Sequence, residues 1–434
     1  MDIQTVAVIG GGTMGSGIAA ACAAAGRDVI LLDATAELAE KALSRVAALA
    51  KDEAEKARFS KRIRVGSIDA DLDRIAGCDW ICEAVVEDLA LKRRILGDVE
   101  KVRRDGSIVS TNTSGIPLRS IVDGAPARLR RDILVTHFFN PVRVMRLLEI
   151  VSGEDTRPEA HDDVARFLKS ALGKGIVEAK DTPNFIGNRI GLYFILSGLH
   201  LAARHRAAGL SLETIDALLG APVGLPSTAL YGLVDLIGLD VIESIAQNLA
   251  ATLPEGDAGR AFAALPAAEQ RLRGRGQLGR KSGGGYYRIS KAPDGSKTKE
   301  VFRLDSEGWA PAQAVQLAPA QADLKTLFFA DSAAGRLVRD VLGGTLCYAA
   351  DLVPDISDDI VNVDRAMRWG FAWAHGPFEL IDRIGAGALI AWLRSEGRPL
   401  PRMLALLERA GARRFYDDVA YLGIDGRMHP LPPE

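Results

Sequence analysis

The chain has 434 residues, of which 48% are hydrophobic, enough for roughly two to three domains with sizeable cores. Its 54 Lys and Arg residues nearly balance 56 Asp and Glu residues, which argues against binding to nucleic acid or a membrane surface through bulk charge. No apolar run is long enough to span a bilayer, and the chain begins with a strand pattern rather than a signal peptide. With four cysteines and no C-x-x-C pair, it is predicted to be cytoplasmic and reduced.

The first predicted element is a short β-branched strand at residues 6–9, typical of a buried parallel strand. Gly10-Gly11-Gly12-Thr13-Met14-Gly15 follows it, and an alanine-rich helix then continues to Gly26. A second strand at residues 29–32 ends in Asp33, which lies 18 residues beyond Gly15. Strand, G-x-G-x-x-G, helix, strand and acid in this order predict a dinucleotide-binding unit of the Rossmann type.

Each of these residues has a physical role in such a unit. Gly10 permits a tight turn, Gly12 lets the backbone approach a pyrophosphate, and Gly15 allows close packing of helix and strand. The helix N-terminus offers free N–H groups to the phosphates. Asp33 would accept the ribose hydroxyls of adenosine and repel a 2′-phosphate, and residues 34–36 supply no arginine. NAD is therefore expected rather than NADP.

Further strands are predicted at residues 80–87 and 107–110, with a helix at 89–103 between them. In a parallel sheet of this type, ligands bind beyond the carboxyl ends of the strands. The polar side chains expected near that crevice are Glu87, Lys92 and Ser114.

The stretch "THFFNP", residues 136–141, places His137 at the end of a predicted buried strand. The next predicted strand, "RLLEIV", contains one carboxylate, Glu149, which lies 12 residues beyond His137. A carboxylate among apolar residues is costly unless it has a partner, and the two side chains would meet if the strands pair. Histidine is the side chain best suited to take a proton near neutral pH. The pair therefore predicts a general base, although a structural histidine that caps a strand is the alternative.

Five stretches resemble the L-3-hydroxyacyl-CoA dehydrogenase family, and they occur in that family's order and spacing. They are "VAVIGGGTMGSGIA", "EAVVEDLALKRRI", "STNTSGIP", "THFFNPVRVMRLLEIV" and "DTPNFIGNRI". The resemblance covers nearly the whole chain and is most specific over residues 5–195. It implies an α/β Rossmann-type domain followed by an all-α C-terminal region. The implied activity is NAD-dependent oxidation of L-3-hydroxyacyl-CoA to 3-oxoacyl-CoA, as in β-oxidation.

By this resemblance, Ser114 and Asn188 join His137 and Glu149 as catalytic residues, and both would also contact the substrate. Residues implied to bind NAD are Gly10, Gly12, Thr13, Met14, Gly15, Asp33, Val86, Glu87, Lys92, Ser114, Asn140 and Lys281.

The charged amphipathic stretch at residues 37–64 predicts a solvated helical hairpin. In shorter relatives, the matching helix carries a serine and a lysine that touch coenzyme A. Here Leu49 and Lys56 stand in the matching stretch. Lys56 is therefore expected to bind the substrate, but the serine is missing.

The second half repeats a pattern. Asp216 and Asp235 are 19 positions apart, Asp364 and Asp382 are 18 apart, and both pairs flank a Gly- or Pro-rich turn. We therefore expect two related helical units, and their apolar faces should cover each other. The domains predicted are 1–182 for NAD binding, 183–290 for the first helical unit, 291–330 for a linker hairpin and 331–434 for the second unit.

The resemblance implies that short relatives pair their single helical unit with that of another subunit. This chain supplies both units, so we predict a monomer. Long relatives also carry an enoyl-CoA hydratase segment, so such a segment or partner beyond Glu434 is possible.

Two alternatives remain. The first is a non-catalytic NAD-binding relative of the crystallin-like or regulatory kind, which fold alone does not exclude. The second is a β-hydroxyacid dehydrogenase of the phosphogluconate type, which uses a lysine and lacks "HFFNP". His200 and His205 are five apart, which is not the spacing of a helical zinc pair, so no metal is predicted.

Overall fold

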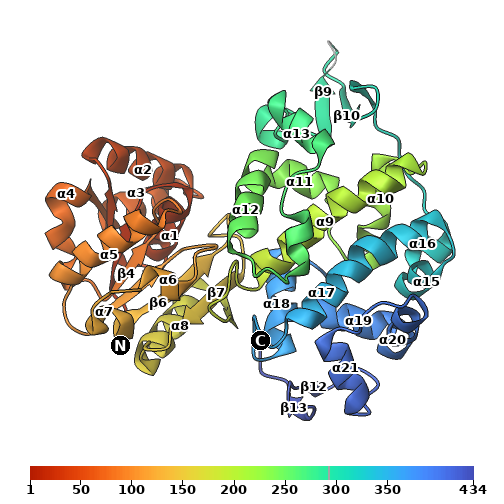
Figure 1. Ribbon diagram of the computed structural model, residues 1–434. Helices are drawn as coiled ribbons and strands as arrows, with labels where there is room; N and C mark the ends of the chain where they lie inside the picture. Colours follow the sequence, from red (N-terminus) through yellow and green to blue (C-terminus); the bar gives the residue numbers. More distant parts are fainter. Residues whose placement is uncertain (292–293) are drawn as a thin grey trace. The chain divides into compact units, whose positions relative to one another are not determined.

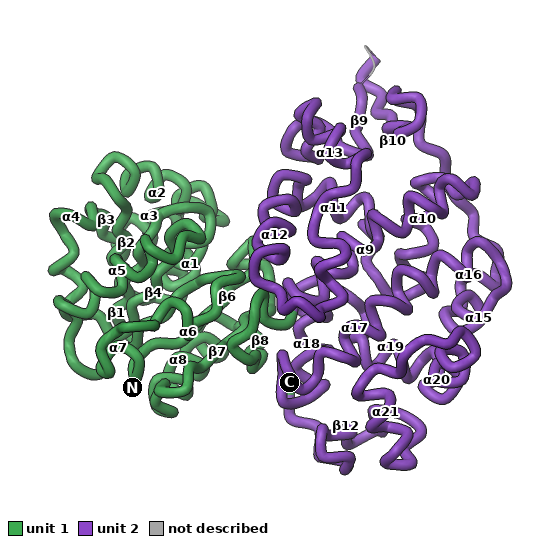
Figure 2. Tube along the Cα trace, viewed as in Figure 1, with its two compact units in different colours: residues 1–186, 434 green, residues 187–433 purple. Residues whose placement is uncertain are grey.

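The computed structural model describes residues 1–291 and 294–434. The chain forms two compact units, residues 1–186 with Glu434 and residues 187–433, which are coloured separately in Figure 2. Each unit is described by itself. Among the described residues, no helix is both long and apolar enough to cross a membrane.

The first unit is built on an eight-stranded sheet with the order β3-β2-β1-β4-β5-β6-β7-β8. Strands β1 to β6 run parallel, β7 is antiparallel to β6, and β8 is parallel to β7. Chain order reverses on the two sides of β1, which is the switch point where nucleotides bind in Rossmann folds. The strands are β1 (Thr5–Ile9), β2 (Asp28–Asp33), β3 (Ile63–Ser67), β4 (Trp80–Glu83), β5 (Ile108–Thr111), β6 (Ile133–Phe138), β7 (Leu147–Ser152) and β8 (Gly175–Glu178).

Helices cover this sheet (Figure 1). Helix α1 packs with α2, α3 and α8, while α5 packs with α6 and η1. The predicted Rossmann-type domain and the helical hairpin, formed by α2 and α3, are confirmed, whereas the strand predicted at 80–87 ends at Glu83. The helices are α1 (Thr13–Ala24), α2 (Ala36–Ala48), α3 (Glu53–Arg62), α4 (Ile68–Asp71), η1 (Leu72–Gly77), α5 (Leu89–Val102), α6 (Leu118–Ile121), α7 (Ala127–Asp132) and α8 (Pro158–Leu172).

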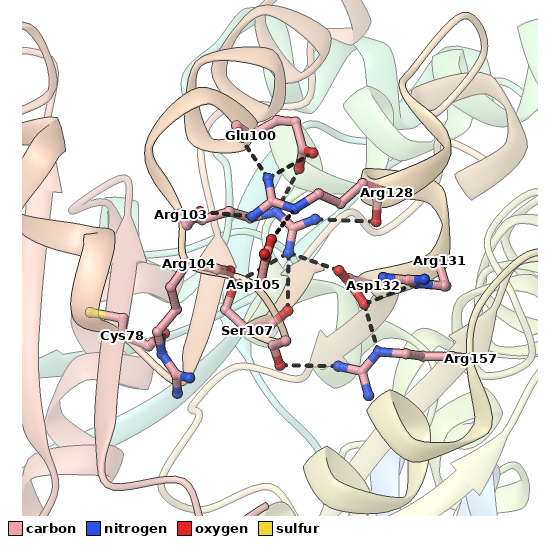
Figure 3. A network of polar contacts seen from close by, with 11 residues as sticks. Cys78, Glu100, Arg103, Arg104, Asp105, Ser107, Arg128, Arg131, Asp132 and Arg157 are labelled. Atoms are coloured by element: carbon pink, nitrogen blue, oxygen red, sulfur yellow. Dashed lines mark hydrogen bonds and ion pairs between the residues drawn. The ribbon is translucent and has the colours of Figure 1, made fainter.

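A buried ionic network lies at the amino-terminal ends of β5 and β6 (Figure 3). The glycine loop, in contrast, follows the carboxyl end of β1. Asp132, whose side chain is 1% exposed, accepts from Nη1 of Arg103 at 2.9 Å and from Nε of Arg157 at 2.6 Å. Arg103 also pairs with Glu100 at 2.5 Å. This network joins α5, α7 and the start of α8 without using any residue predicted for the site.

The second unit is mainly helical, but it is not all-α as predicted. It contains a three-stranded sheet, β11-β10-β9, and a small hairpin, β12-β13. Strands β9 and β10 pair antiparallel, with β9 mostly ahead of the segment 291–330 that was predicted as a linker hairpin and β10 inside it; residues 292 and 293 lie outside the described residues. The strands are β9 (Tyr287–Lys291), β10 (Lys297–Arg303), β11 (Gly308–Pro311), β12 (Ala420–Leu422) and β13 (Met428–Pro430).

Helix α9 (Gly187–Ala207) is the longest helix described and contacts helices from both halves of the second unit (Figure 1). The remaining helices are α10 (Leu212–Leu218), η2 (Ala221–Val223), α11 (Tyr231–Ile237), α12 (Leu239–Thr252), η3 (Ala258–Phe262), α13 (Ala267–Gly274), η4 (Arg280–Ser282), α14 (Pro319–Ala322), α15 (Leu324–Phe329), α16 (Ala333–Val338), the π-helix η5 (Arg339–Gly343), α17 (Gly344–Leu352), α18 (Ile360–Gly370), α19 (Pro377–Ile384), α20 (Ala386–Ser395) and α21 (Arg402–Arg409).

Two aspartates organise the first half of this unit. Asp216 accepts from the backbone N–H of Tyr231 at 2.8 Å, at the start of α11. Asp235 accepts from the N–H groups of Tyr286 at 2.8 Å and Tyr287 at 2.7 Å. Each carboxylate thus ties a helix to a segment later in the chain.

Two aspartates of the second half make the same kinds of contact. Asp364 accepts from the N–H of Phe378 at 2.8 Å, near the start of α19. Asp382 accepts from the N–H groups of Phe415 at 2.8 Å and Tyr416 at 2.9 Å. The aspartate spacing noticed in the sequence therefore corresponds to a shared hydrogen-bonding pattern.

The second half packs directly on α9. A Cβ atom at Gly191 would come within 2.0 Å of the Phe371 ring, so only glycine fits there. Nε of Arg189 donates to the Tyr348 hydroxyl at 2.7 Å, and that hydroxyl donates to Asp257 at 2.9 Å. Six apolar residues of the second half are all fully buried: Leu342, Leu346, Phe378, Leu380, Ile381 and Ile384.

Candidate active site

The glycine loop between β1 and α1 has the shape that a dinucleotide requires. Gly10 has a φ of +104°, and a Cβ there would lie 2.7 Å from the Ala84 carbonyl oxygen. A Cβ on Gly15 would lie 1.8 Å from the carbonyl oxygen of Gly10. In contrast, a Cβ on Gly12 would meet nothing within 4 Å. Backbone is therefore packed tightly on one side of the loop, and the helix N-terminus at Thr13 is open to an anion on the other.

Asp33 ends β2 beside this loop, as predicted. One oxygen accepts from the N–H of Gly11 at 3.0 Å and the other from the N–H of Ala34 at 2.7 Å. The sequence argument overlooked Arg45 on α2, whose guanidinium donates to the Gly11 carbonyl at 2.8 Å. An arginine thus lies next to the glycine loop beside Asp33, even though residues 34–36 supply none.

The loops after β4 and β5 are joined by Glu87. Its Oε1 accepts from the Thr113 hydroxyl at 2.6 Å and from the N–H groups of Ser114 and Gly115, each at 2.9 Å. Burial alone would raise the pKa of Glu87, but Lys92 and these donors hold it below its usual value. Ser114 is therefore fixed beside an ionised carboxylate.

Two other residues predicted to bind the cofactor differ sharply in exposure. The side chain of Lys92 is 1% exposed and its ammonium pairs with Glu83 and Glu87. Val86 is 70% exposed. Glu83 did not feature in the sequence prediction, although it is a carboxylate among apolar residues, just as Glu149 is.

His137 and Glu149 are directly opposite each other in the antiparallel pair β6–β7, as the sequence predicted. Nδ1 of the imidazole is 2.7 Å from Oε2 of the carboxylate, and both side chains are buried. The second oxygen, Oε1, accepts from the N–H of Ile186 at 3.0 Å. In the tautomer whose Nδ1–H donates to Glu149, Nε2 is the ring nitrogen that carries no proton.

The turn before α9 delivers the Ile186 N–H. Asn184 and Phe185 have φ values of +62° and +50°, a left-handed conformation that is uncommon for residues other than glycine. The Phe185 ring is also 5.7 Å from the His137 ring, and the Phe139 ring is 4.5 Å from it. The turn thus supports the Glu149 carboxylate and contributes to the apolar surroundings of the imidazole.

The remaining predicted residues lie elsewhere. Asn140 is exposed in the loop after β6, and Lys56 is exposed on α3, 3.3 Å from Glu53. In the second unit, Asn188 is half-buried in the first turn of α9, and Lys281 in η4 is 2.8 Å from Asp240. Their roles in binding stay predictions.

A Rossmann sheet with a fitting glycine loop, together with a histidine–carboxylate pair on neighbouring strands, defines a dinucleotide-dependent dehydrogenase as the class of protein. The comparisons give the family. Residues 5–182 match the 3-hydroxyacyl-CoA dehydrogenase NAD-binding domain, and residues 185–289 match the C-terminal domain of the same enzymes. The chain belongs to the 3-hydroxyacyl-CoA dehydrogenase family, and its first unit is the NAD-binding domain.

Individual relatives agree. A 3-hydroxyacyl-CoA dehydrogenase of Deinococcus radiodurans is 36% identical over 67% of this chain and 84% of its own length. A Rickettsia felis protein, named as a fatty acid oxidation complex trifunctional enzyme, is 34% identical over 88% of this chain and 53% of its own. The crystal structure of 3-hydroxybutyryl-CoA dehydrogenase from Escherichia coli has the same fold, with a TM-score of 0.68 at 23% identity, over 92% of this chain and 96% of its own. The chain spans about half the length of the longer curated relatives.

Proposed function

We propose that this protein catalyses the NAD-dependent oxidation of L-3-hydroxyacyl-CoA to 3-oxoacyl-CoA, in the manner of β-oxidation. The observation that carries the proposal is the buried contact of 2.7 Å between His137 and Glu149, on a sheet that also carries the glycine loop. A protein that only binds NAD has no need for such a pair.

In this proposal Nε2 of His137 takes the proton of the substrate hydroxyl. Glu149 holds the Nδ1–H tautomer and stabilises the imidazolium that forms. Ser114 and Asn188 orient the substrate oxygens, and Lys56 binds the coenzyme A part. NAD, when bound, accepts the hydride. The open approach to Gly12 and the carboxylate of Asp33 are the features of this chain that suit that cofactor.

The test is oxidation of NADH in the presence of acetoacetyl-CoA, compared with free 3-oxo acids and with buffer. Activity with the thioester alone is expected. No turnover would favour the non-catalytic relative, and preference for a free acid would favour the phosphogluconate type. Replacement of His137 by Gln should lower kcat by about 10²–10⁴-fold with little change in NADH binding, because general acid–base chemistry is lost.

We also propose that the two halves of the second unit are related copies and that the protein is a monomer. Support comes from hydrogen bonds of the same kind in the two halves. Asp216 and Asp364 each accept from a backbone N–H near the start of a later helix, and Asp235 and Asp382 each accept from two consecutive N–H groups farther along the chain. The second half also covers α9, which would otherwise expose an apolar face. Light scattering should give the mass of one chain. A stable dimer joined through residues 184–250 of both chains would contradict the proposal.

The name of the Rickettsia relative suggests a wider pathway. We propose that an enoyl-CoA hydratase, on the same polypeptide or a partner, supplies the 3-hydroxyacyl thioester. Residues 1–434 should therefore form NADH from crotonyl-CoA and NAD only after a hydratase is added. NADH formation without added hydratase would overturn this arrangement.

A further inference from the structure

The glycine loop is contacted by two side chains of opposite charge at the end of β2. Oδ2 of Asp33 accepts from the N–H of Gly11 at 3.0 Å, and Nη1 of Arg45 donates to the carbonyl oxygen of the same glycine at 2.8 Å. A carboxylate and a guanidinium therefore bind the two backbone groups of one loop residue. The carboxylate suits the ribose hydroxyls of NAD, whereas the guanidinium suits an anion.

The packing of α2 sets the position of Arg45. Ala42 and Arg45 are three residues apart on this helix and lie on the same face. Ala42 is fully buried, and a Cβ on Gly11 would lie 2.4 Å from the Ala42 Cβ and 2.8 Å from Oδ2 of Asp33. Helix α2 thus packs directly against the loop, and its last turn places the guanidinium next to Gly11.

The guanidinium of Arg45 is able to bind a further anion. Its side chain is exposed, and the contact with Gly11 uses one of the five N–H donors of a guanidinium. Within residues 1–291 and 294–434, this contact is the only hydrogen bond that the guanidinium makes. The residue after Asp33 is an exposed alanine, Ala34, so the carboxylate is not followed by a large side chain.

A brace for the glycine loop is the simplest role for Arg45, but the loop has other supports. The buried hydroxyl of Ser16 also donates to the Gly11 carbonyl, at 2.9 Å. Asp33 holds the N–H of the same residue. Both backbone groups of Gly11 would therefore keep a partner without Arg45, so the shape of the loop does not require the arginine.

In dinucleotide-binding folds, the acid at the end of the second strand binds the ribose 2′-hydroxyl of NAD, and a nearby arginine accommodates the 2′-phosphate of NADP. We propose that Arg45 is a specificity-determining residue for the cofactor, because its guanidinium binds that 2′-phosphate. Asp33 repels the phosphate and Arg45 attracts it, so the preference for NAD is the difference between the two effects. This inference concerns binding by the NAD-binding domain and does not depend on the proposed reaction.

The test is the Kd of NADH and of NADPH, measured by cofactor fluorescence at low ionic strength, where charge pairs are least screened. The unaltered protein is compared with Arg45→Met, Asp33→Ser and the double variant. Asp33→Ser removes the repulsive charge and should bring NADPH binding into the measurable range. In that background, Arg45→Met should raise the Kd of NADPH about tenfold or more, because a charge-assisted hydrogen bond to phosphate is lost. The Kd of NADH should change by less than about threefold.

Two further variants sharpen the comparison. Arg45→Lys keeps the positive charge without the planar fork, so in the Asp33→Ser background its Kd for NADPH should lie between those of arginine and methionine. Arg58→Met is the matched control, because Arg58 is exposed on α3 and donates to the Ala24 carbonyl at 3.3 Å, at the end of α1 away from the glycine loop. It should leave the Kd of both cofactors unchanged.

Two kinds of result would overturn the inference. An equal rise in the Kd of NADH and NADPH on Arg45→Met would make the arginine a support of the loop and not a specificity residue. An unchanged Kd of NADPH, or no measurable NADPH binding, in the Asp33→Ser background would show that the guanidinium does not reach the 2′-phosphate. Because these measurements need no turnover, they decide the role of Arg45 whether or not the protein oxidises 3-hydroxyacyl-CoA.

Discussion

Replacing Glu149 by Gln should nearly abolish turnover while leaving the fold intact. Glutamine has the same size and its carbonyl can still accept from the Ile186 N–H. However, its NH₂ group would then donate to Nδ1 of His137. The imidazole would have to carry its proton on Nε2, the nitrogen that must accept the proton of the substrate hydroxyl. The negative charge that supports the imidazolium would also be lost.

The size of the electrostatic loss follows from the observed contact of 2.7 Å. With about 4 Å between the charge centres and an effective dielectric constant of about 20, the attraction is about 4 kcal/mol. If it acts fully in the transition state, this corresponds to about a 10³-fold loss in rate. The measurement is kcat for oxidation of 3-hydroxybutyryl-CoA at saturating NAD.

Glu178→Gln is the matched control for this prediction, because Glu178 is a carboxylate on the adjacent strand β8 that pairs with His161 rather than His137. Its kcat should match that of the unaltered protein. A Glu149→Gln variant that keeps more than about a tenth of the activity would refute the argument, since the carboxylate would then contribute under about 1.4 kcal/mol.

The remaining predictions concern the cofactor, stability and pH. The unaltered protein should strongly prefer NADH to NADPH, and Asp33→Ser should relax this preference; equal kcat/KM for both cofactors before mutation would contradict the role of the acid. Asp132→Ala should lower the free energy of unfolding by about 3–5 kcal/mol, because it removes the buried carboxylate that pairs with both Arg103 and Arg157. Asp105→Ala, which removes a carboxylate of 95% exposure in the same network, should cost less than about 1 kcal/mol; similar urea midpoints for the two variants would argue against this. The ion pair with Glu178 raises the pKa of His161 to about 9, so its contribution to stability should be complete below about pH 6.5 and lost as the pH rises through about 9. Urea unfolding of His161→Ala should therefore show a deficit at pH 6 that is absent at pH 10, and an equal deficit at both would refute the assignment.

The sequence predicted those parts of the site that depend on local spacing. The glycine loop and Asp33 are set by one strand–helix–strand unit. His137 and Glu149 belong to consecutive strands, so their pairing needed only a hairpin-like return of the chain. The sequence could not predict the hydrogen bonds that Asp216 accepts, because the tertiary packing of helices brings the donating N–H groups next to it.

Lys92 shows how a signal was present but not used. Buried residues of α5 fall at positions 92, 95, 96 and 99, a helical stripe in which Lys92 is the only charged member. A lysine in an apolar stripe requires a buried carboxylate, and Glu83, within the apolar strand "WICEAV", was the available one. The next two residues, Arg93 and Arg94, are exposed. Composition alone could therefore not show which of these three basic side chains is buried.

The contacts of α9 with the second half have a consequence for symmetry. In a symmetric dimer, both surfaces of the interface come from the same sequence, so a substitution at one position changes both copies of a contact at once. When both sides belong to one polypeptide, each side can carry a different residue. Gly191 against Phe371, and Arg189 against Tyr348, are contacts in which each partner occurs once and can change alone. The helix that carries Asn188 is thus free to keep the residues that a site requires, while the surface that holds it diverges on its own.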